Sequence, residues 1–216
     1  MGHLNIVGMM RMLRRAAARK EVIEACKHFK CQACGDAQHQ KHPAPTRYVA
    51  DYVFGAKLAV DTFTVHDVVG DAFHFMNILC LGSAFQVCAF LGHARGIPSA
   101  DACLSAFTRC WASWAGMPTA LICDRGKENQ GSFARALQQH GVEIDQAALE
   151  SPWQMGKCER HGAIWKDIFA KVCHDTQIQG NRDVETVSVI INQTKNDLYR
   201  QAGYSPSQWV FGCHGV

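Results

Sequence analysis

Residues 120–166 read ALICDRGKENQGSFARALQQHGVEIDQAALESPWQMGKCERHGAIWK, and this stretch decides the fold. It contains a short apolar strand, a helical run, a second short strand and an amphipathic helix. The first strand ends on Asp124, and Glu159 opens the last helix after a turn with Pro, Trp, Gln and Gly. Upstream, the strand-like LAVDTFTV carries a third acid, Asp61. Because a carboxylate among apolar residues is costly to bury without a compensating cation, three such acids suggest a divalent-metal site.

The segments around this stretch predict an α/β fold with a five-stranded mixed sheet flanked by helices. AKLAVDTFTV, AFHFMNILCL and AFQVCAFL are β-rich and separated by turns, which predicts an antiparallel meander. A helix capped by Ser99 and ended by Gly116 follows. Since MPTALIC comes after this crossover helix, we expect it to lie parallel to the first strand and beside it. A helix over 131–140 and the strand VEI precede the Glu159 helix; further helices are expected over 183–201 and from Ser205.

Composition excludes several protein classes. The chain has 216 residues, of which 48% are hydrophobic, and it holds no run of about eighteen apolar residues that would cross a membrane. Its first residues are polar and basic, without the apolar core of a secretory signal. Eleven cysteines are scattered and odd in number. We therefore expect an intracellular protein whose thiols are reduced and mostly act as small buried hydrophobes.

Charge is distributed unevenly along the chain. Residues 1–50 hold nine Lys and Arg against three Asp and Glu, whereas the remainder holds thirteen against sixteen. A basic arm before a mildly acidic core fits a phosphate-contacting appendage and a carboxylate-bearing active site. The alternative is that the arm is simply a solvated basic helix.

The first fifty residues predict a small helical module and a linker. Apolar spacing indicates helices over 3–18 and 20–29, after which Cys31-Gln-Ala-Cys34 offers two thiolates to one tetrahedral zinc. A redox role suits this pair less well, because no strand precedes it. The expected domains are a helical module over 1–36, a linker over 37–55, a catalytic core over 56–175 and a helical extension over 176–216.

The motifs resemble those of retroviral and LTR-retrotransposon integrases, the D,D-35-E family with a ribonuclease-H-like core. The matching segments are AVDTF, CDRGKEN, SPWQMGKCERHG, the tail GYSPSQWVFG and the start GHLNIVGMMRMLRR with CQAC. The resemblance implies that Asp61, Asp124 and Glu159 are catalytic and hold two Mg²⁺ or Mn²⁺ ions. It also implies an N-terminal zinc site with two histidines, of which His3 matches the second. We therefore expect an incomplete site made of His3, Cys31 and Cys34, with His28, His39 or His42 as possible substitutes.

The resemblance further implies a function and its partners. Such an enzyme is a polynucleotidyl transferase that cuts element DNA ends and joins them to target DNA, acts as a homo-oligomer and works in the nucleus. Positions i, i+3, i+4 and i+7 share a helix face, so Lys166 should stand two turns from Glu159 on the active-site side, with Gly162 and Ala163 between them. Lys166, Lys157 and Arg160 are then the expected DNA contacts, although an ordinary solvated lysine is the competing interpretation.

Several alternatives stay open at this point. The step from Asp124 to Glu159 is 35 positions, one shorter than the family's usual spacing, and Glu128 is the second candidate for the third acid. Asp67 and Asp71 are more simply solvated turn residues. A ribonuclease H or a transposase would use the same metal chemistry, and a catalytically inactive, nucleic-acid-binding remnant of an integrase would keep the fold alone.

Overall fold

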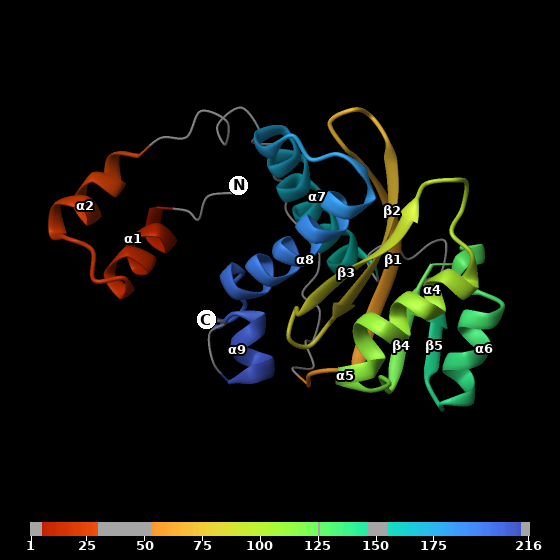
Figure 1. Cartoon of the computed structure of the whole chain (residues 1–216). Helices are drawn as coiled ribbons and strands as arrows, with labels where there is room; N and C mark the ends of the chain where they lie inside the picture. Colours follow the sequence, from red (N-terminus) through yellow and green to blue (C-terminus); the bar gives the residue numbers. More distant parts are fainter. Residues whose placement is uncertain (1–5, 30–52, 125, 147–154, 213–216) are drawn as a thin grey trace. The chain divides into compact units, whose positions relative to one another are not determined.

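The computed structural model describes residues 6–29, 53–124, 126–146 and 155–212 (Figure 1). The chain divides into two compact units, residues 1–48 and 49–216. This division falls inside the segment 37–55 that the sequence predicts as a linker. Among the described residues, no helix is both long enough and apolar enough to cross a membrane.

The first unit contains two short helices. Helix α1 spans Ile6–Arg15, and α2 spans Lys20–Ala25 and continues as the 3₁₀ turn η1, Cys26–His28. Both are shorter than the predicted helices over 3–18 and 20–29. No side chain described between residues 6 and 29 is fully buried.

The second unit is built on a five-stranded sheet in the order β3-β2-β1-β4-β5. The strands are β1 (Lys57–His66), β2 (Ala72–Cys80), β3 (Gln86–His93), β4 (Ala120–Cys123) and β5 (Glu143–Gln146). The first three pair antiparallel, whereas β4 is parallel to both β1 and β5. The predicted meander, and the predicted place of the fourth strand beside the first, are both confirmed.

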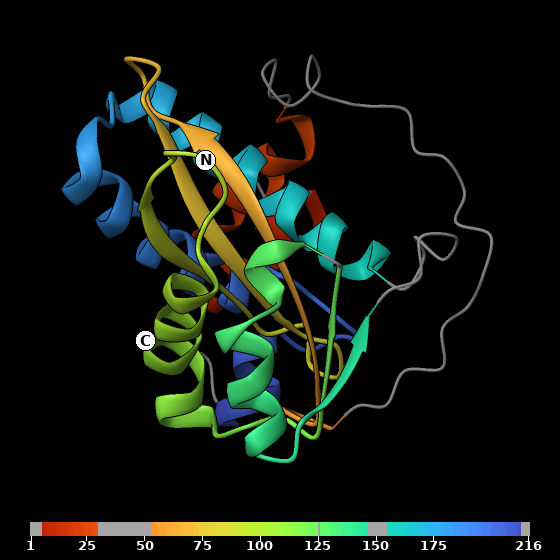
Figure 2. The same ribbon diagram turned by 90° about the vertical axis from the view of Figure 1, so that its right-hand side faces the viewer.

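Helices cover both faces of this sheet (Figures 1 and 2). On one face lie α4 (Ala100–Phe107), η2 (Thr108–Ala112), α5 (Ser113–Ala115), η3 (Lys127–Asn129) and α6 (Ser132–Gln139). On the other lie α7 (Gly156–Thr176) and α8 (Gly180–Leu198), and α9 (Pro206–Phe211) packs against α8. One difference from the prediction is η2, where the helix after Ser99 widens to π-helical turns before it ends at Gly116.

Alternation along β1 decides which face each side chain occupies. Leu58 and Val60 belong to the core beneath α4 and α6, which also holds Trp111 and Phe133. Phe63 instead packs with Trp165 of α7. Because Asp61 shares its side of the strand with Phe63, the fold places its carboxylate on the face that α7 covers.

The edge strand β3 is closed by side chains of α8. Asn196 accepts the N–H of Gln86 at 2.9 Å and donates to its carbonyl at 2.8 Å. One turn earlier, Asn192 accepts the N–H of Cys88 at 3.0 Å and donates to the carbonyl of Cys88 at 3.1 Å. Two carboxamides therefore act as a substitute strand and satisfy an edge that would otherwise invite pairing with another chain.

The turn after β1 corrects one expectation. Asp71 is exposed as predicted, but Asp67 is only 6% exposed. Its carboxylate accepts backbone N–H groups from Val69 and Asp71 in its own turn, and from Gly180 at the start of α8. Asp67 is thus a structural acceptor that ties the hairpin to α8 and not a solvated turn residue.

Candidate active site

Asp61 lies on β1, and Asp124 directly follows β4, the parallel strand beside it. Val60 of β1 is in register with Cys123 of β4, so the next positions, Asp61 and Asp124, are neighbours across the sheet. Preceding residues on the same side, Ala59 and Ile122, pack in one cluster with Cys158 of α7. The alternation of side chains therefore aims Asp61 at the face that carries α7, and the charge of Asp124, directly after β4, reaches Asp61.

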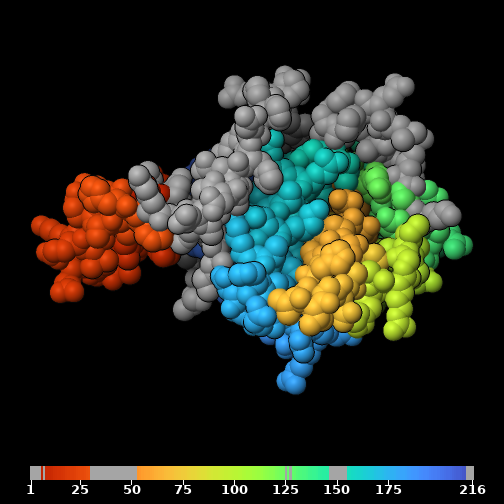
Figure 3. Space-filling view, turned by 90° about the horizontal axis from the view of Figure 1, so that it is seen from above, coloured from red at the N-terminus to blue at the C-terminus, as the bar shows by residue number. Residues whose placement is uncertain are grey.

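Glu159 lies in the first turn of α7 and is exposed. This helix packs on β1 and β2, and it lies directly beside the β1–β2 hairpin in Figure 3 (teal to blue beside orange). A carboxylate in a first turn is favoured by the unsatisfied N–H groups at the helix start. Glu159 thus begins a helix, as the sequence predicts, and its charge reaches Asp61 of β1.

The pKa of Asp61 is affected by the charges of both other acids. The pKa of Asp61 is raised to about 6, chiefly by burial and also by the negative charges of Asp124 and Glu159, while the Thr62 N–H and the Lys166 ammonium act in the opposite direction. The Thr62 N–H donates to Oδ1 of Asp61 at 2.8 Å. Repulsion among carboxylates at this point is the condition that a bound cation relieves.

Asp124 is held by its own loop. Its Oδ1 accepts the Gly126 N–H at 3.0 Å and Nδ2 of Asn129 at 2.6 Å. Asn129 is buried, and its Oδ1 has no hydrogen-bond partner among the described residues. Sequence reasoning did not single out Asn129, although its place five residues after Asp124 in DRGKEN was the available signal.

Glu128, the second candidate for the third acid, is engaged elsewhere. It is 8% exposed and accepts the Thr62 hydroxyl at 3.0 Å. It also packs over Gly126 so closely that a Cβ there would lie 2.6 Å from the carboxylate. Since Thr62 and Asp61 point to opposite sides of β1, the contact with Thr62 places Glu128 on the side away from α7.

The donor chemistry of the site fits a hard divalent cation. Carboxylate oxygens are the ligands that Mg²⁺ prefers, and it keeps several waters, so few protein ligands suffice. Within the described part of the chain, no three His, Cys, Asp or Glu side chains converge so that they could hold an ion. The charges of Asp124 and Glu159 therefore reach Asp61, but the three carboxylates are not a pre-assembled set of ligands.

The three predicted DNA-contacting residues differ in their surroundings. Lys166 is exposed, its Nζ lies 5.5 Å from the Phe63 ring centroid, and its charge reaches Asp61. Arg160 is also exposed. Lys157 is half-buried, and its Nζ donates to the Leu81 carbonyl at 2.6 Å and to Oε1 of Gln201 at 3.1 Å. Its ammonium thus joins α7 to two loops, which favours a structural role.

One further expectation differs from the structure, and the predicted zinc site lies mostly outside the described residues. Gly162, expected on the face with Glu159 and Lys166, is buried beside Asn77 and Phe63. The zinc-site residues His3, Cys31 and Cys34 lie outside the described residues, as do the substitutes His39 and His42. His28, the remaining substitute, is exposed at the end of η1.

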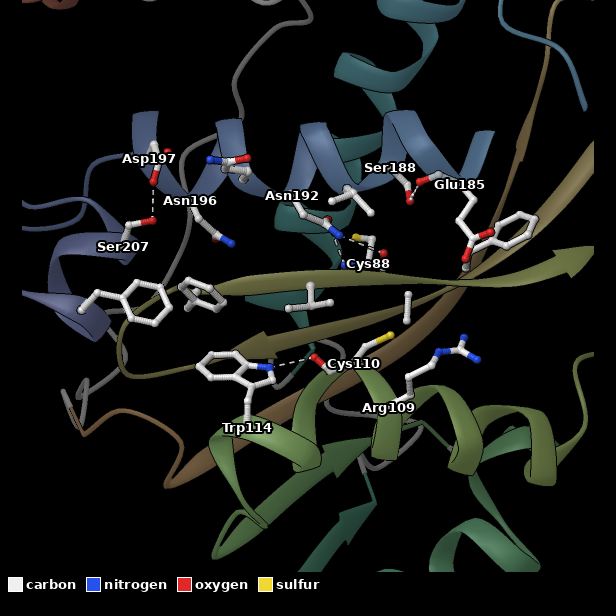
Figure 4. A pocket seen from close by; sticks show the side chains of 17 residues that line it. Cys88, Arg109, Cys110, Trp114, Glu185, Ser188, Asn192, Asn196, Asp197 and Ser207 are labelled. Atoms are coloured by element: carbon white, nitrogen blue, oxygen red, sulfur yellow. Dashed lines mark hydrogen bonds between the residues drawn. The ribbon is translucent and has the colours of Figure 1, made fainter. Parts of the chain in front are cut away.

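A groove of about 460 Å³ lies on another side of the unit, away from the acids (Figure 4). Segments η2 and α5 form one wall, α8 and α9 form the other, and β3 forms the floor. Trp114, Val189 and Phe211 line it and are 44%, 61% and 57% exposed. Large apolar side chains exposed together around a groove mark a surface suited to another macromolecule.

Comparisons with known proteins support the fold. No protein-family model and no curated protein matches the chain. A chain from the structure of the simian T-cell lymphotropic virus intasome in complex with PP2A regulatory subunit B56 gamma is similar at 15% identity, with a TM-score of 0.64, over 93% of this chain and 69% of that one.

Two isolated domains are similar as well. The HTLV-2 integrase catalytic core domain in complex with magnesium, in its dimeric form, shares 15% identity and a TM-score of 0.59 over 72% of this chain and 96% of its own. The catalytic core domain of BIV integrase shares 13% identity and a TM-score of 0.55 over 73% and 95%. At these identities the likeness establishes the fold: a mixed five-stranded sheet with flanking helices, as in ribonuclease-H-like integrase cores.

Proposed function

We propose that this chain is the catalytic core of a retroelement integrase, a metal-dependent polynucleotidyl transferase that cuts element DNA ends and joins them to target DNA. The observation that carries the proposal is the shared field of Asp61, Asp124 and Glu159 at one end of an integrase-like sheet. Three acids from separate segments of the chain, two of which raise the pKa of the third, fit a cation site better than they fit a purely structural role.

Each residue has a distinct task in this proposal. Asp61 and Asp124 bind and orient divalent cations from the ends of adjacent strands, and Glu159 completes the coordination from α7. When bound, Mg²⁺ or Mn²⁺ supplies charge stabilisation for the attacking and leaving oxygens of the phosphodiester. Asn129 holds the Asp124 carboxylate, which limits its rotation before any ion arrives. Lys166 and Arg160 contact the DNA backbone, so these contacts confer little sequence specificity.

The remaining parts of the proposal concern partners and place. The HTLV-2 integrase core is described in dimeric and trimeric forms, which supports a homo-oligomer here too. The exposed apolar residues of the groove in Figure 4 are a suitable surface for that contact. We further propose that His3, Cys31 and Cys34 hold zinc in the first unit, and that the protein acts on DNA in the nucleus.

A single substitution tests the chemistry. Glu159→Gln keeps the size of the side chain and removes its charge, so Mg²⁺-dependent nicking of a DNA oligonucleotide should fall by orders of magnitude, since each ~1.4 kcal/mol of lost stabilisation is tenfold. DNA binding should persist, because it depends on basic residues. Glu128→Gln is the matched control and should nick DNA at the parent rate.

Other outcomes would identify the competing functions. If Glu128→Gln loses activity and Glu159→Gln does not, the third acid is misassigned. If the parent binds DNA but does not nick it with Mg²⁺ or Mn²⁺, the inactive, nucleic-acid-binding remnant is the correct description.

A further inference from the structure

Asn77 is a fully buried polar residue directly beside the proposed site. It lies on β2, where it is the cross-strand partner of Asp61, and it has no exposed surface. Burying a carboxamide is costly unless its donors and acceptor are paired. Its contacts therefore show what this position is used for.

Those contacts attach α7 to the sheet. Nδ2 of Asn77 donates to the carbonyl of Cys158 at 3.1 Å and lies 3.3 Å from its Sγ. Oδ1 of Asn77 accepts Nε2 of Gln86 at 2.6 Å, and the backbone of Gln86 is itself fixed by Asn196. Because the carbonyl of Cys158 can only accept, the amide of Asn77 has one favourable orientation, with its NH₂ group toward α7 and its Oδ1 toward Gln86.

The helix comes unusually close to the sheet at this point. A Cβ added to Gly162 would lie 3.2 Å from Nδ2 of Asn77 and 3.9 Å from the Phe63 ring. Even one methyl group there would force Asn77 or the helix to shift. Gly162 thus permits the short distance that the Asn77–Cys158 hydrogen bond requires.

We infer that Asn77 is a positioning residue that sets where Glu159 stands relative to Asp61. Cys158 directly precedes Glu159, and Asn77 is the cross-strand partner of Asp61, so one side-chain hydrogen bond joins the backbone next to Glu159 to the strand paired with Asp61. Apolar packing alone would let a helix slide, whereas a bond to a backbone carbonyl fixes its position along the axis. Metal ligands must be held within about 0.5 Å, which such second contacts provide. This inference rests on the proposed function.

The test measures metal affinity directly. In the full chain, Asn77→Leu keeps a similar volume and removes the bonds to Cys158 and Gln86. Mn²⁺ binding, followed by the loss of the free-ion EPR signal, should weaken about tenfold, as expected when an outer-shell partner of a ligand is removed. The Mg²⁺ concentration for half-maximal nicking should rise by a similar factor, and saturating metal should restore most of the rate. Val184→Ala, in the fully buried core of α8, is the control for lost stability alone and should leave both values unchanged.

A second variant keeps the inference testable if Asn77→Leu does not fold. Gly162→Ala favours the helix, because Ala loses less backbone freedom than Gly, but it places a methyl group against Asn77. A positioning role predicts weaker Mn²⁺ binding in this variant without a fall in Tm. Parent-like Mn²⁺ affinity in Gly162→Ala and in any folded Asn77→Leu would overturn the inference.

Glu159→Gln separates this inference from the function beneath it. If Glu159→Gln weakens Mn²⁺ binding while Asn77→Leu and Gly162→Ala do not, only the positioning role is wrong. If Glu159→Gln binds Mn²⁺ like the parent, Glu159 is not a ligand, and both the proposed function and this inference fall.

Discussion

Nζ of Lys195 on α8 lies 2.8 Å from Nδ1 of His161 on α7, and both side chains are buried. Burial, followed by the nearby charges of Lys195, Lys157 and Arg160, lowers the pKa of His161 to about 2. Burial is also the main cause that lowers the pKa of Lys195 to about 8. The imidazole is therefore neutral at physiological pH and accepts the hydrogen bond that the ammonium donates, so the pair fastens α8 to the helix that carries Glu159.

The first prediction concerns the pH dependence of this pair. Between pH 8 and 10.5 the unfolded chain keeps the Lys195 proton and the folded chain releases it, so Lys195 adds stability as the pH rises through that window. Relative to Lys195→Met, the parent's free energy of unfolding should increase by about 1–2 kcal/mol between pH 7 and pH 9.5. Denaturant titrations of both proteins at both pH values measure it.

The pH dependence of the parent must be compared with that of Lys195→Met, because buried thiols lower the free energy of unfolding as the pH rises, whereas Lys195 raises it. Burial raises the pKa values of Cys88 and Cys158, so the folded chain holds their protons longer and loses stability at high pH. Both proteins share this loss, and it cancels in the difference. A difference that does not change with pH would mean that Lys195 is not buried as a cation.

The second prediction concerns the free energy of unfolding that the ionised Asp61 carboxylate costs when no cation neutralises it. Burial and the neighbouring acids raise its pKa from 3.8 to about 6, so its stabilising contribution is full below pH 3.8 and is lost as the pH rises through 6. At pH 7.5 without metal, Asp61→Asn should therefore be more stable than the parent. Because the side chain is half-exposed, solvent screening limits the gain to the order of 1 kcal/mol.

Thermal unfolding in EDTA at pH 7.5 and pH 4.5 checks this expectation. The gap between Asp61→Asn and the parent should shrink at pH 4.5, where the parent's carboxyl is largely protonated. Added Mg²⁺ should raise the Tm of the parent but not that of the variant, because a ligand stabilises only the folded state that binds it. An equal rise in both proteins would place the ion elsewhere.

Local patterns in the sequence predicted the sheet and the presence of its helices, although α8 begins and ends three residues before the predicted range 183–201. Alternating apolar residues located β1 to β3, and the crossover before MPTALIC placed β4 beside β1. Ser205 was expected to begin a helical turn, and it caps α9 with a reciprocal bond to Gln208. These features depend on residues close together in the chain, which is why periodicity and capping rules detect them.

Contacts between distant segments were not predictable in the same way. Asp67 resembles any turn acid until Gly180, 113 residues later, donates to it. In the sequence, Lys157 resembles any solvated lysine next to the site. Only the fold shows that its ammonium donates a hydrogen bond to the Leu81 carbonyl, 76 positions before it. Neither the Lys195–His161 pair nor Asn77 carries a local signal, because each becomes meaningful only after α7 and α8 pack on the sheet.

The third prediction tests Lys166 as a DNA contact. Lys166→Ala should weaken DNA binding several-fold and reduce the slope of affinity against salt by about one unit, since one phosphate contact is lost. Its charge also lowers the pKa of Asp61, so the acid side of the pH–rate profile should move to higher pH in this variant. Fluorescence anisotropy and nicking rates across pH measure the two effects.

Lys171→Ala is the matched control for this prediction. It removes the same charge from the same helix, but its Nζ is paired with Asp167 at 2.7 Å. It should leave the pH–rate profile in place and change DNA binding much less. Equal losses in both variants would indicate a general effect of net charge and not a contact by Lys166.

The last prediction concerns the substitute strand formed by α8. Asn196→Leu leaves the N–H and the carbonyl of Gln86 buried without their partners, and the loss of two backbone bonds should cost about 2–4 kcal/mol. Because the edge of β3 then lacks these two hydrogen-bond partners, the variant should also self-associate at concentrations where the parent does not. Denaturant unfolding measures the first effect and light scattering the second. Thr194→Leu adds a comparable apolar side chain at an exposed position on the same helix, outside the groove of Figure 4, so it controls for added hydrophobicity. If both variants unfold and associate alike, the carboxamide of Asn196 does not protect the edge, and α8 holds β3 by apolar packing alone.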